Sequence, residues 1–165
     1  MSLIWSEIMF VPDQKIVEET ALAWKWLVPE PWKIIFSSMF GGVFLEKEAG
    51  DVHWLECGTG VIEKVANSAA EFHAFLSGPR DDAWASRVDD WFLPPLVQQL
   101  HKAGKIAGPD QCYGFTILPI FKGGTYNVEN CFVVSAREWF TLAGSIHEQV
   151  CDVPDGSQVK MKIVD

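Results

Sequence analysis

The residues of this chain that could perform chemistry form no recognised catalytic or metal-binding motif. Glu148 follows His147, but no second histidine stands four residues further on, so the zinc-protease motif is incomplete. No Gly-x-Ser-x-Gly sequence occurs, which argues against the exposed serine nucleophile of α/β-hydrolases. Gly58-Thr59-Gly60 and Gly123-Gly124-Thr125 lack the lysine that a phosphate-binding loop requires. The sequence therefore predicts no catalytic residue, no metal site and no cofactor.

The cysteines are spread along the chain without a Cys-x-x-Cys pair, at positions 57, 112, 131 and 151. Their spacing fits neither a zinc ribbon nor a small disulfide scaffold. Cys131 begins an apolar run, in which a free thiol packs like a small hydrophobic side chain. The sequence therefore predicts four reduced cysteines in a reducing compartment.

His147 supports more than one interpretation, because it lies beside the apolar stripe of a predicted helix and not at its centre. A hydrogen-bonded structural histidine is favoured. The alternative is an enzyme whose site, including His147 and Glu129, is assembled only in the folded chain; a deep pocket holding both side chains would support it. A third interpretation is a sensor of small ligands or peptides, with aromatic residues lining a groove.

Four aspartates flank two tryptophans in the stretch 81–91. On a helix, Trp84, Val88 and Trp91 share one face with position 81, whereas positions 82, 89 and 90 lie off it. Two interpretations stay open: a solvated acidic face over a buried aromatic stripe, or an acidic contact surface for a cationic partner. For Glu129-Asn130 a structural role is favoured, in which the asparagine bonds to local backbone. The predicted contact residues are Asp81, Asp82, Trp84, Asp89, Asp90 and Glu129.

The elements that position these side chains can be predicted from local signals. The chain has 165 residues, of which 48% are hydrophobic, enough for one core. We expect a single domain over residues 1–165, with a subdivision near 104–111 left open. A helix begins after Asp13, which is a suitable N-cap. Pro31 is expected to open a second helix that carries Ile34, Ile35 and Met39.

The remaining signals predict strands and helices in turn. Short runs rich in β-branched and aromatic residues form an antiparallel meander over 43–48, 52–57 and 61–66. Ser68 and Ser135 each begin a capping-box sequence and open helices, and Pro94-Pro95 ends or kinks the helix that carries Trp84, Val88 and Trp91. Further strands are expected at 113–120, 128–134 and 158–164. The predicted class is α+β: an antiparallel meander plus helices, ending in a strand–helix–strand unit.

The formal net charge of −9 narrows the choice of partner. A negative surface repels phosphate backbones and anionic lipids, so direct binding to nucleic acid or membrane is disfavoured. It favours a basic protein partner. No cationic leader, cleavage site or long apolar run is visible, so the protein is expected to be soluble and cytoplasmic.

Motifs in the last third of the chain resemble one protein family. They are Cys112-Tyr113-Gly114-Phe115, Gly123-Gly124, Val128-Glu129-Asn130, Gly144-Ser145-Ile146-His147-Glu148-Gln149-Val150 and Pro154-Asp155-Gly156. Together they resemble the C-terminal domain of type VI secretion DNase-immunity proteins, best over about 107–165 and more weakly over 41–66 and 68–76. The motif residues are Gly123, Gly124, Glu129, Asn130, His147, Gln149, Pro154 and Gly156.

The resemblance implies an antitoxin and not an enzyme. Proteins of this kind bind a cognate toxin nuclease in the producing cell and prevent self-intoxication. The expected function is therefore neutralisation of a secreted bacterial toxin, a nuclease, by protein–protein binding. Nucleases tend to be basic because they bind phosphate, which agrees with the acidity of this chain. The sequence leaves the oligomeric state open.

Overall fold

The computed structural model describes residues 4–160, which form two antiparallel sheets and six helices. The larger sheet has five strands in chain order: β1 (Met9–Phe10), β2 (Trp32–Ser38), β3 (Val43–Lys47), β4 (Val52–Leu55) and β5 (Ile62–Ala66). The smaller sheet pairs β6 (Gln111–Phe115) with β7 (Cys131–Ser135). The helices are α1 (Trp5–Ile8), α2 (Gln14–Ala23), α3 (Ala69–Ser77), α4 (Asp82–Phe92), α5 (Pro94–Lys102) and α6 (Ala136–Val150). The predicted α+β class is confirmed.

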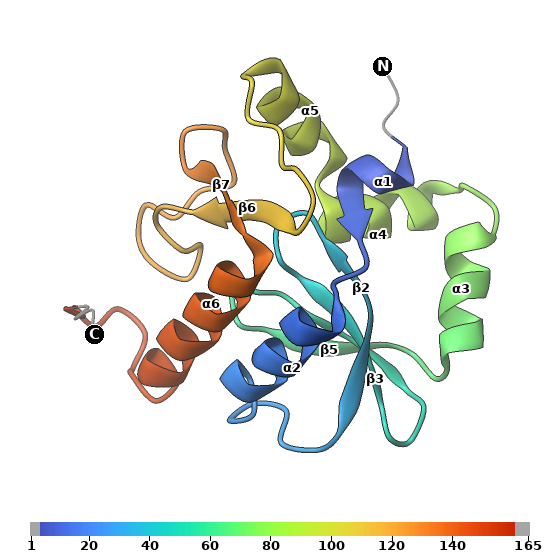
Figure 1. Cartoon of the computed structure of the whole chain (residues 1–165), viewed down its shortest axis with the longest axis horizontal. Helices are drawn as coiled ribbons and strands as arrows, with labels where there is room; N and C mark the ends of the chain where they lie inside the picture. The colour runs from blue at the N-terminus through green and yellow to red at the C-terminus, as the bar shows by residue number, and fades with distance from the viewer. Residues whose placement is uncertain (1–3, 161–165) are drawn as a thin grey trace.

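The helices cover the larger sheet from two sides. Figure 1 shows α3 and α4 on one side of this sheet and α2 with α6 on the other, while β6 and β7 lie beside α6. The two helices α2 and α6 touch at Gly144, where an added Cβ would stand 2.6 Å from the carbonyl oxygen of Ala23. Glycine is therefore needed at this contact, because a side chain would force the helices apart.

Local sequence signals explain where the predicted helices begin. The side chains of Asp13, Ser68 and Ser135 each accept a hydrogen bond from the backbone N–H three residues ahead. Each bond satisfies an amide that has no partner within its helix. The start of α4 uses the same device, because the carboxylate of Asp81 accepts from the backbone N–H of Trp84 at 2.9 Å. The three helix starts predicted at 13, 68 and 135 are confirmed.

The predicted meander is confirmed as β3, β4 and β5, but the second predicted helix is wrong. Residues 32–38 form β2, a strand paired with β1 on one side and β3 on the other. Ile34, Ile35 and Phe36 suit a strand, since β-branched and aromatic side chains pack well on a pleated surface. The apolar residues follow no simple alternation because both faces of this part of the sheet are covered. Pro31 precedes the strand and opens no helix.

Two strands near the C-terminus are shorter than predicted. The strand expected at 113–120 ends at Phe115, and the one expected at 128–134 begins at Cys131. The intervening residues 116–130 form a loop with its own hydrogen bonds, which we call the 116–130 loop. Of the strand expected at 158–164, residues 158–160 form no strand and the rest lie outside the described residues.

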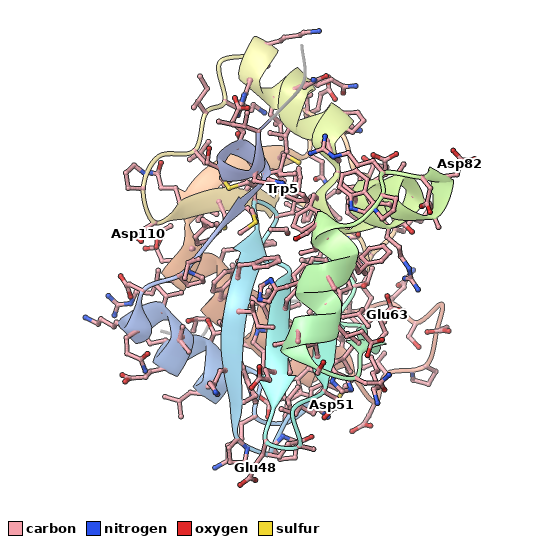
Figure 2. All side chains as sticks on the ribbon, turned by 90° about the vertical axis from the view of Figure 1, so that its right-hand side faces the viewer. Trp5, Glu48, Asp51, Glu63, Asp82 and Asp110 are labelled. Atoms are coloured by element: carbon pink, nitrogen blue, oxygen red, sulfur yellow. The ribbon has the colours of Figure 1, made fainter. Side chains whose placement is uncertain are left out.

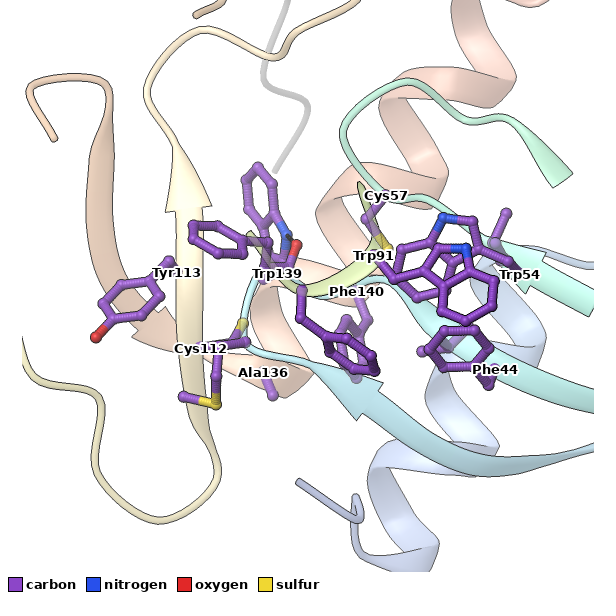
Figure 3. Packing of buried hydrophobic residues seen from close by; sticks show 14 of the residues in the cluster. Phe44, Trp54, Cys57, Trp91, Cys112, Tyr113, Ala136, Trp139 and Phe140 are labelled. Atoms are coloured by element: carbon purple, nitrogen blue, oxygen red, sulfur yellow. Dashed lines mark hydrogen bonds between the residues drawn. The ribbon is translucent and has the colours of Figure 1, made fainter. Parts of the chain in front are cut away.

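One hydrophobic core runs through both sheets. On the larger sheet, the ring of Phe44 lies 4.4 Å from that of Trp54 and 4.7 Å from that of Phe72 in α3. On the other side, the buried Trp139 and Phe140 of α6 reach Gly41 in the β2–β3 turn. Figure 3 shows these two groups of rings next to each other, with Cys112 and Tyr113 of β6 continuing the packing.

Candidate functional site

The predicted contact residues of the stretch 81–91 belong to α4, a helix with two unlike faces. Val88 and Trp91 are buried, whereas Asp82, Asp89 and Asp90 are exposed. Asp82 and Asp89 lie seven residues apart, so they project from the same side of the helix, opposite Trp91. Figure 2 shows Asp82 at the end of α4, at the edge of the molecule. The structure therefore brings two of the four predicted aspartates, Asp82 and Asp89, together on one outer surface, which we call the α4 face, whereas Asp90 lies about 100° further round the helix.

Asp81 and Trp84 have structural partners that limit what else they can do. Asp81 caps the helix, as described above. The indole N–H of Trp84 donates to the carbonyl oxygen of Leu76 at 3.1 Å, and its ring lies 6.1 Å from that of Trp5. Trp84 is half-buried, and the guanidinium of Arg80 lies 5.2 Å from its ring centre. These contacts join α1, α3 and α4, so Trp84 positions the α4 face and exposes only part of its ring.

Arg87, a cation on α4 itself, already has interaction partners within the chain. Arg87 lies 3.3 Å from a carboxylate oxygen of Glu63 on β5, and its guanidinium sits 5.6 Å from the ring centre of Trp91. Figure 2 shows Glu63 on the same side of the molecule as Asp82. Because the pair Arg87–Glu63 is neutral, the net charge of this surface comes from the aspartates. Its exposed carboxylates are hydrated and available to a cationic partner.

Glu129 is placed apart from the aspartates. It is exposed on the 116–130 loop, and no described interaction joins it to α4. Its neighbour Asn130 is 8% exposed and holds this loop together. The Asn130 amide donates to the carbonyl oxygens of Ile117 (2.8 Å) and Thr125 (2.9 Å), and its own oxygen accepts from the backbone N–H of Ile117 (2.9 Å). The structural role favoured for Asn130 is confirmed.

The two glycines of the family motif in this loop occupy positions where a side chain would cause strain or a clash. Gly123 has φ of +87°, a left-handed conformation that other residues adopt only with strain. A Cβ on Gly124 would stand 2.1 Å from the carbonyl oxygen of Leu118, so the backbone could not approach this closely with any side chain there. Lys105 adds two more bonds, donating to the carbonyl oxygens of Val128 (2.6 Å) and Cys131 (2.7 Å).

A polar cluster next to α4 was not predicted from the sequence. The hydroxyl of Tyr126 donates to one carboxylate oxygen of Glu56, and Thr59 donates to the other at 2.8 Å. Partial burial, reinforced by the Glu56 carboxylate, raises the pKa of Tyr126. Asp90 lines the same small cavity as Glu56 and Tyr126, with a volume of about 10 Å³ that suits a single water molecule. No sequence signal connects these residues, because they lie in three separate segments.

His147 has the structural role that the sequence favoured. It is 2% exposed, and its Nε2 lies 2.8 Å from the carbonyl oxygen of Cys57. Its ring packs against Trp24 of α2, at 5.6 Å between ring centres. Burial lowers the pKa of His147, so the neutral ring is favoured. The exposed Glu129 and the buried His147 line no common pocket among the described residues, which leaves the predicted enzyme site without geometric support.

The remaining motif residues lie at the surface near the end of α6. Gln149 donates to the carbonyl oxygen of Ser145 at 3.2 Å, and Pro154 and Gly156 form the predicted turn, with φ of +81° at Gly156.

Among residues 4–160, no three His, Cys, Asp or Glu side chains are placed to hold a metal ion. All four cysteines are free, and burial raises the pKa of the Cys57 and Cys112 thiols. Within the described residues, no helix has the length and apolar character needed to cross a bilayer.

Part of the chain matches a known protein family. Residues 69–147 match the family model described as T6SS immunity protein Tdi1, C-terminal. This match confirms the resemblance to type VI secretion immunity proteins. It starts in α3, within the weaker resemblance at 68–76, and it ends at His147, so residues 41–66 and the motif residues Gln149, Pro154 and Gly156 lie outside it. An immunity family implies a cognate toxin as the binding partner.

The whole fold also has a structural relative. It is similar to the crystal structure of Atu4351 from Agrobacterium tumefaciens, with a TM-score of 0.55 and 18% sequence identity. The similarity covers 86% of this chain and 69% of the other. At this identity the likeness shows a shared fold. No curated protein matches the chain.

Proposed function

Because residues 69–147 match a family of type VI secretion immunity proteins, we propose that this protein neutralises a cognate secreted toxin by stoichiometric binding. The toxin is a nuclease, and the complex forms in the cytoplasm. The protein acts by occupying the toxin surface and catalyses no reaction. The family match carries the proposal, and the acidic α4 face supports the choice of a basic, phosphate-binding toxin.

The proposed contact surface is the α4 face. Asp82 and Asp89 are separated by about 10 Å along the helix axis, from the rise of seven residues. They present their carboxylates to the cations that would otherwise bind DNA phosphates, and Asp90 adds a third carboxylate about 100° further round the helix. Asp81 and Trp84 support this surface from its edge, and Glu129 is proposed as a separate contact on the 116–130 loop.

The immunity role is tested in cells. The chain is co-produced with the toxin encoded beside its gene, and growth is compared with that of cells producing the toxin alone. We expect protection, and a complex of one chain with one toxin in sedimentation experiments on the purified pair. Absence of both protection and a complex would contradict the proposal.

The contact surface is tested by charge reversal with a matched control. The double variant Asp82→Lys/Asp89→Lys should slow association with the toxin about tenfold or more and weaken the salt dependence of the association rate. The control is Glu18→Lys/Glu48→Lys, which changes the net charge equally; Glu48 lies at the opposite end of the molecule in Figure 2. Equal rates for the two double variants would exclude the α4 face while leaving the immunity role intact.

A further inference from the structure

Exposed apolar side chains gather around one groove, far from the carboxylates of α4 in sequence. The groove has a volume of about 1450 Å³. Its exposed members include Ile117 (41%), Ile120 (45%), Phe132 (38%) and Leu142 (50%). Isolated exposed apolar residues are ordinary, but several around one hollow mark an interaction site. The groove is formed by residues 115–118, 120–122, 132, 139, 142, 146 and 156–160.

The floor and one wall of the groove have a fixed shape. Trp139 (2% exposed) and Ile146 (8%) of α6 form part of the floor and belong to the core. The wall is the 116–130 loop, whose backbone is bonded to Asn130 at Ile117 and Thr125. A loop held by so many internal bonds presents its side chains without a large ordering cost on binding. The floor and this wall of the groove are therefore formed before any partner arrives.

The charged side chains that line the groove are positive, whereas the chain as a whole is negative. Among the described residues that line the groove, the charged side chains are Lys122 and Lys160, and none carries a carboxylate. The chain as a whole carries −9. Screening by physiological salt, with a Debye length of about 8 Å, reduces the influence of distant carboxylates on a ligand in the groove. Asp155 adjoins the lining residue Gly156 in sequence but does not itself line the groove.

We propose that this groove binds an apolar segment of a partner protein that carries carboxylate groups. Its apolar side chains lie over Trp139, Phe132 and Leu142, and its carboxylates pair with Lys122 and Lys160. This site is separate from the α4 face and selects a partner of opposite charge. The protein therefore has two binding surfaces, one for a basic toxin and one for an acidic apolar segment.

The test uses the full chain and two synthetic peptides of equal length, in which leucine alternates with glutamate or with lysine. Fluorescence anisotropy should show binding of the leucine–glutamate peptide and at least about tenfold weaker binding of the leucine–lysine peptide. Lys122→Glu/Lys160→Glu should reverse that preference, whereas Lys15→Glu/Lys102→Glu, at exposed sites outside the groove, should not. Equal binding of both peptides, or binding of neither, would overturn the proposal.

A second pair of variants tests the place of binding. Leu142→Ser should weaken the leucine–glutamate peptide about tenfold, and Leu22→Ser, an exposed leucine outside the groove, should not. Thermal melting of each variant checks that the fold is kept. If the wild type dimerises and Leu142→Ser abolishes the dimer, a second copy fills the groove and the proposed occupant is wrong. The toxin association rate should be unchanged in these variants, so the outcome is independent of the immunity proposal.

Discussion

The α4 face and the groove beside α6 differ in both charge and construction. The α4 face is a regular helix whose exposed side carries aspartates over a tightly packed aromatic interior. The groove is built from a loop, two strands, a helix and the segment 156–160, with apolar side chains at its surface and two lysines. Charge acts over a longer range than apolar contact, so the first surface is suited to rapid encounter and the second to selection at close range. The two proposed surfaces would give this chain two independent modes of recognition.

The largest effect on stability is expected from a substitution in the core behind the α4 face. Phe44 is fully buried and its ring lies within 5.7 Å of the rings of Trp54, Phe72, Trp91 and Phe92. Phe44→Ala should lower the free energy of unfolding by about 3–5 kcal/mol because it leaves a cavity. Phe132→Ala, at a groove position, should cost less than about 1 kcal/mol. Urea denaturation measures both, and equal losses would mean that Phe132 is a core residue.

The groove depends on the polar bonds of its loop. Asn130→Ala removes three hydrogen bonds and leaves backbone groups of Ile117 and Thr125 without partners, so it should cost about 3 kcal/mol. It should also abolish peptide binding in the groove while the association rate with the toxin is kept. Asn130→Asp keeps the acceptor but sets a carboxylate oxygen against the carbonyl oxygens of Ile117 and Thr125, so it should cost at least as much as the alanine variant. A loss confined to stability, with peptide binding unchanged, would show that the loop does not shape the groove.

The smallest expected effect lies at His147 of α6, which packs against Trp24 of α2 and bonds to the carbonyl oxygen of Cys57. Its pKa is lowered by burial in the folded protein, against an unfolded value of about 6.5. Between these two values the unfolded chain binds more protons, so the free energy of unfolding decreases as pH falls below about 6.5 and levels off below the folded pKa. His53, whose pKa burial also lowers, adds a contribution of the same sign.

The His147 contribution can be isolated by substitution. His147→Gln should reduce the dependence of unfolding free energy on pH, by at most about 1.4 kcal/mol per pH unit, in urea denaturation between about pH 7.5 and pH 5.5. The exposed His73→Gln serves as control and should keep the wild-type dependence. An unchanged slope in His147→Gln would show that the buried ring is not linked to folding through its proton.

Part of the candidate site could be predicted from the sequence. The two faces of α4 follow from the spacing of Trp84, Val88 and Trp91, and the burial of the last two matches that spacing. The cluster of Glu56, Thr59 and Tyr126 could not be predicted, because the hydrogen bond between Glu56 and Tyr126 spans 70 residues. The groove likewise combines segments from β6 to residue 160.

The sequence by itself determined the elements whose signals are local. The caps at Ser68 and Ser135, the glycine turns of the meander and the helical stripes act within a few residues, and they specify α3, α6 and β3–β5. Only the tertiary structure decided that residues 32–38 form a strand, since that outcome depends on pairing with β1 and β3. It also decided the course of the 116–130 loop, because the bonds between Asn130 and Ile117 form only when the two ends of the loop, 13 residues apart, are brought together.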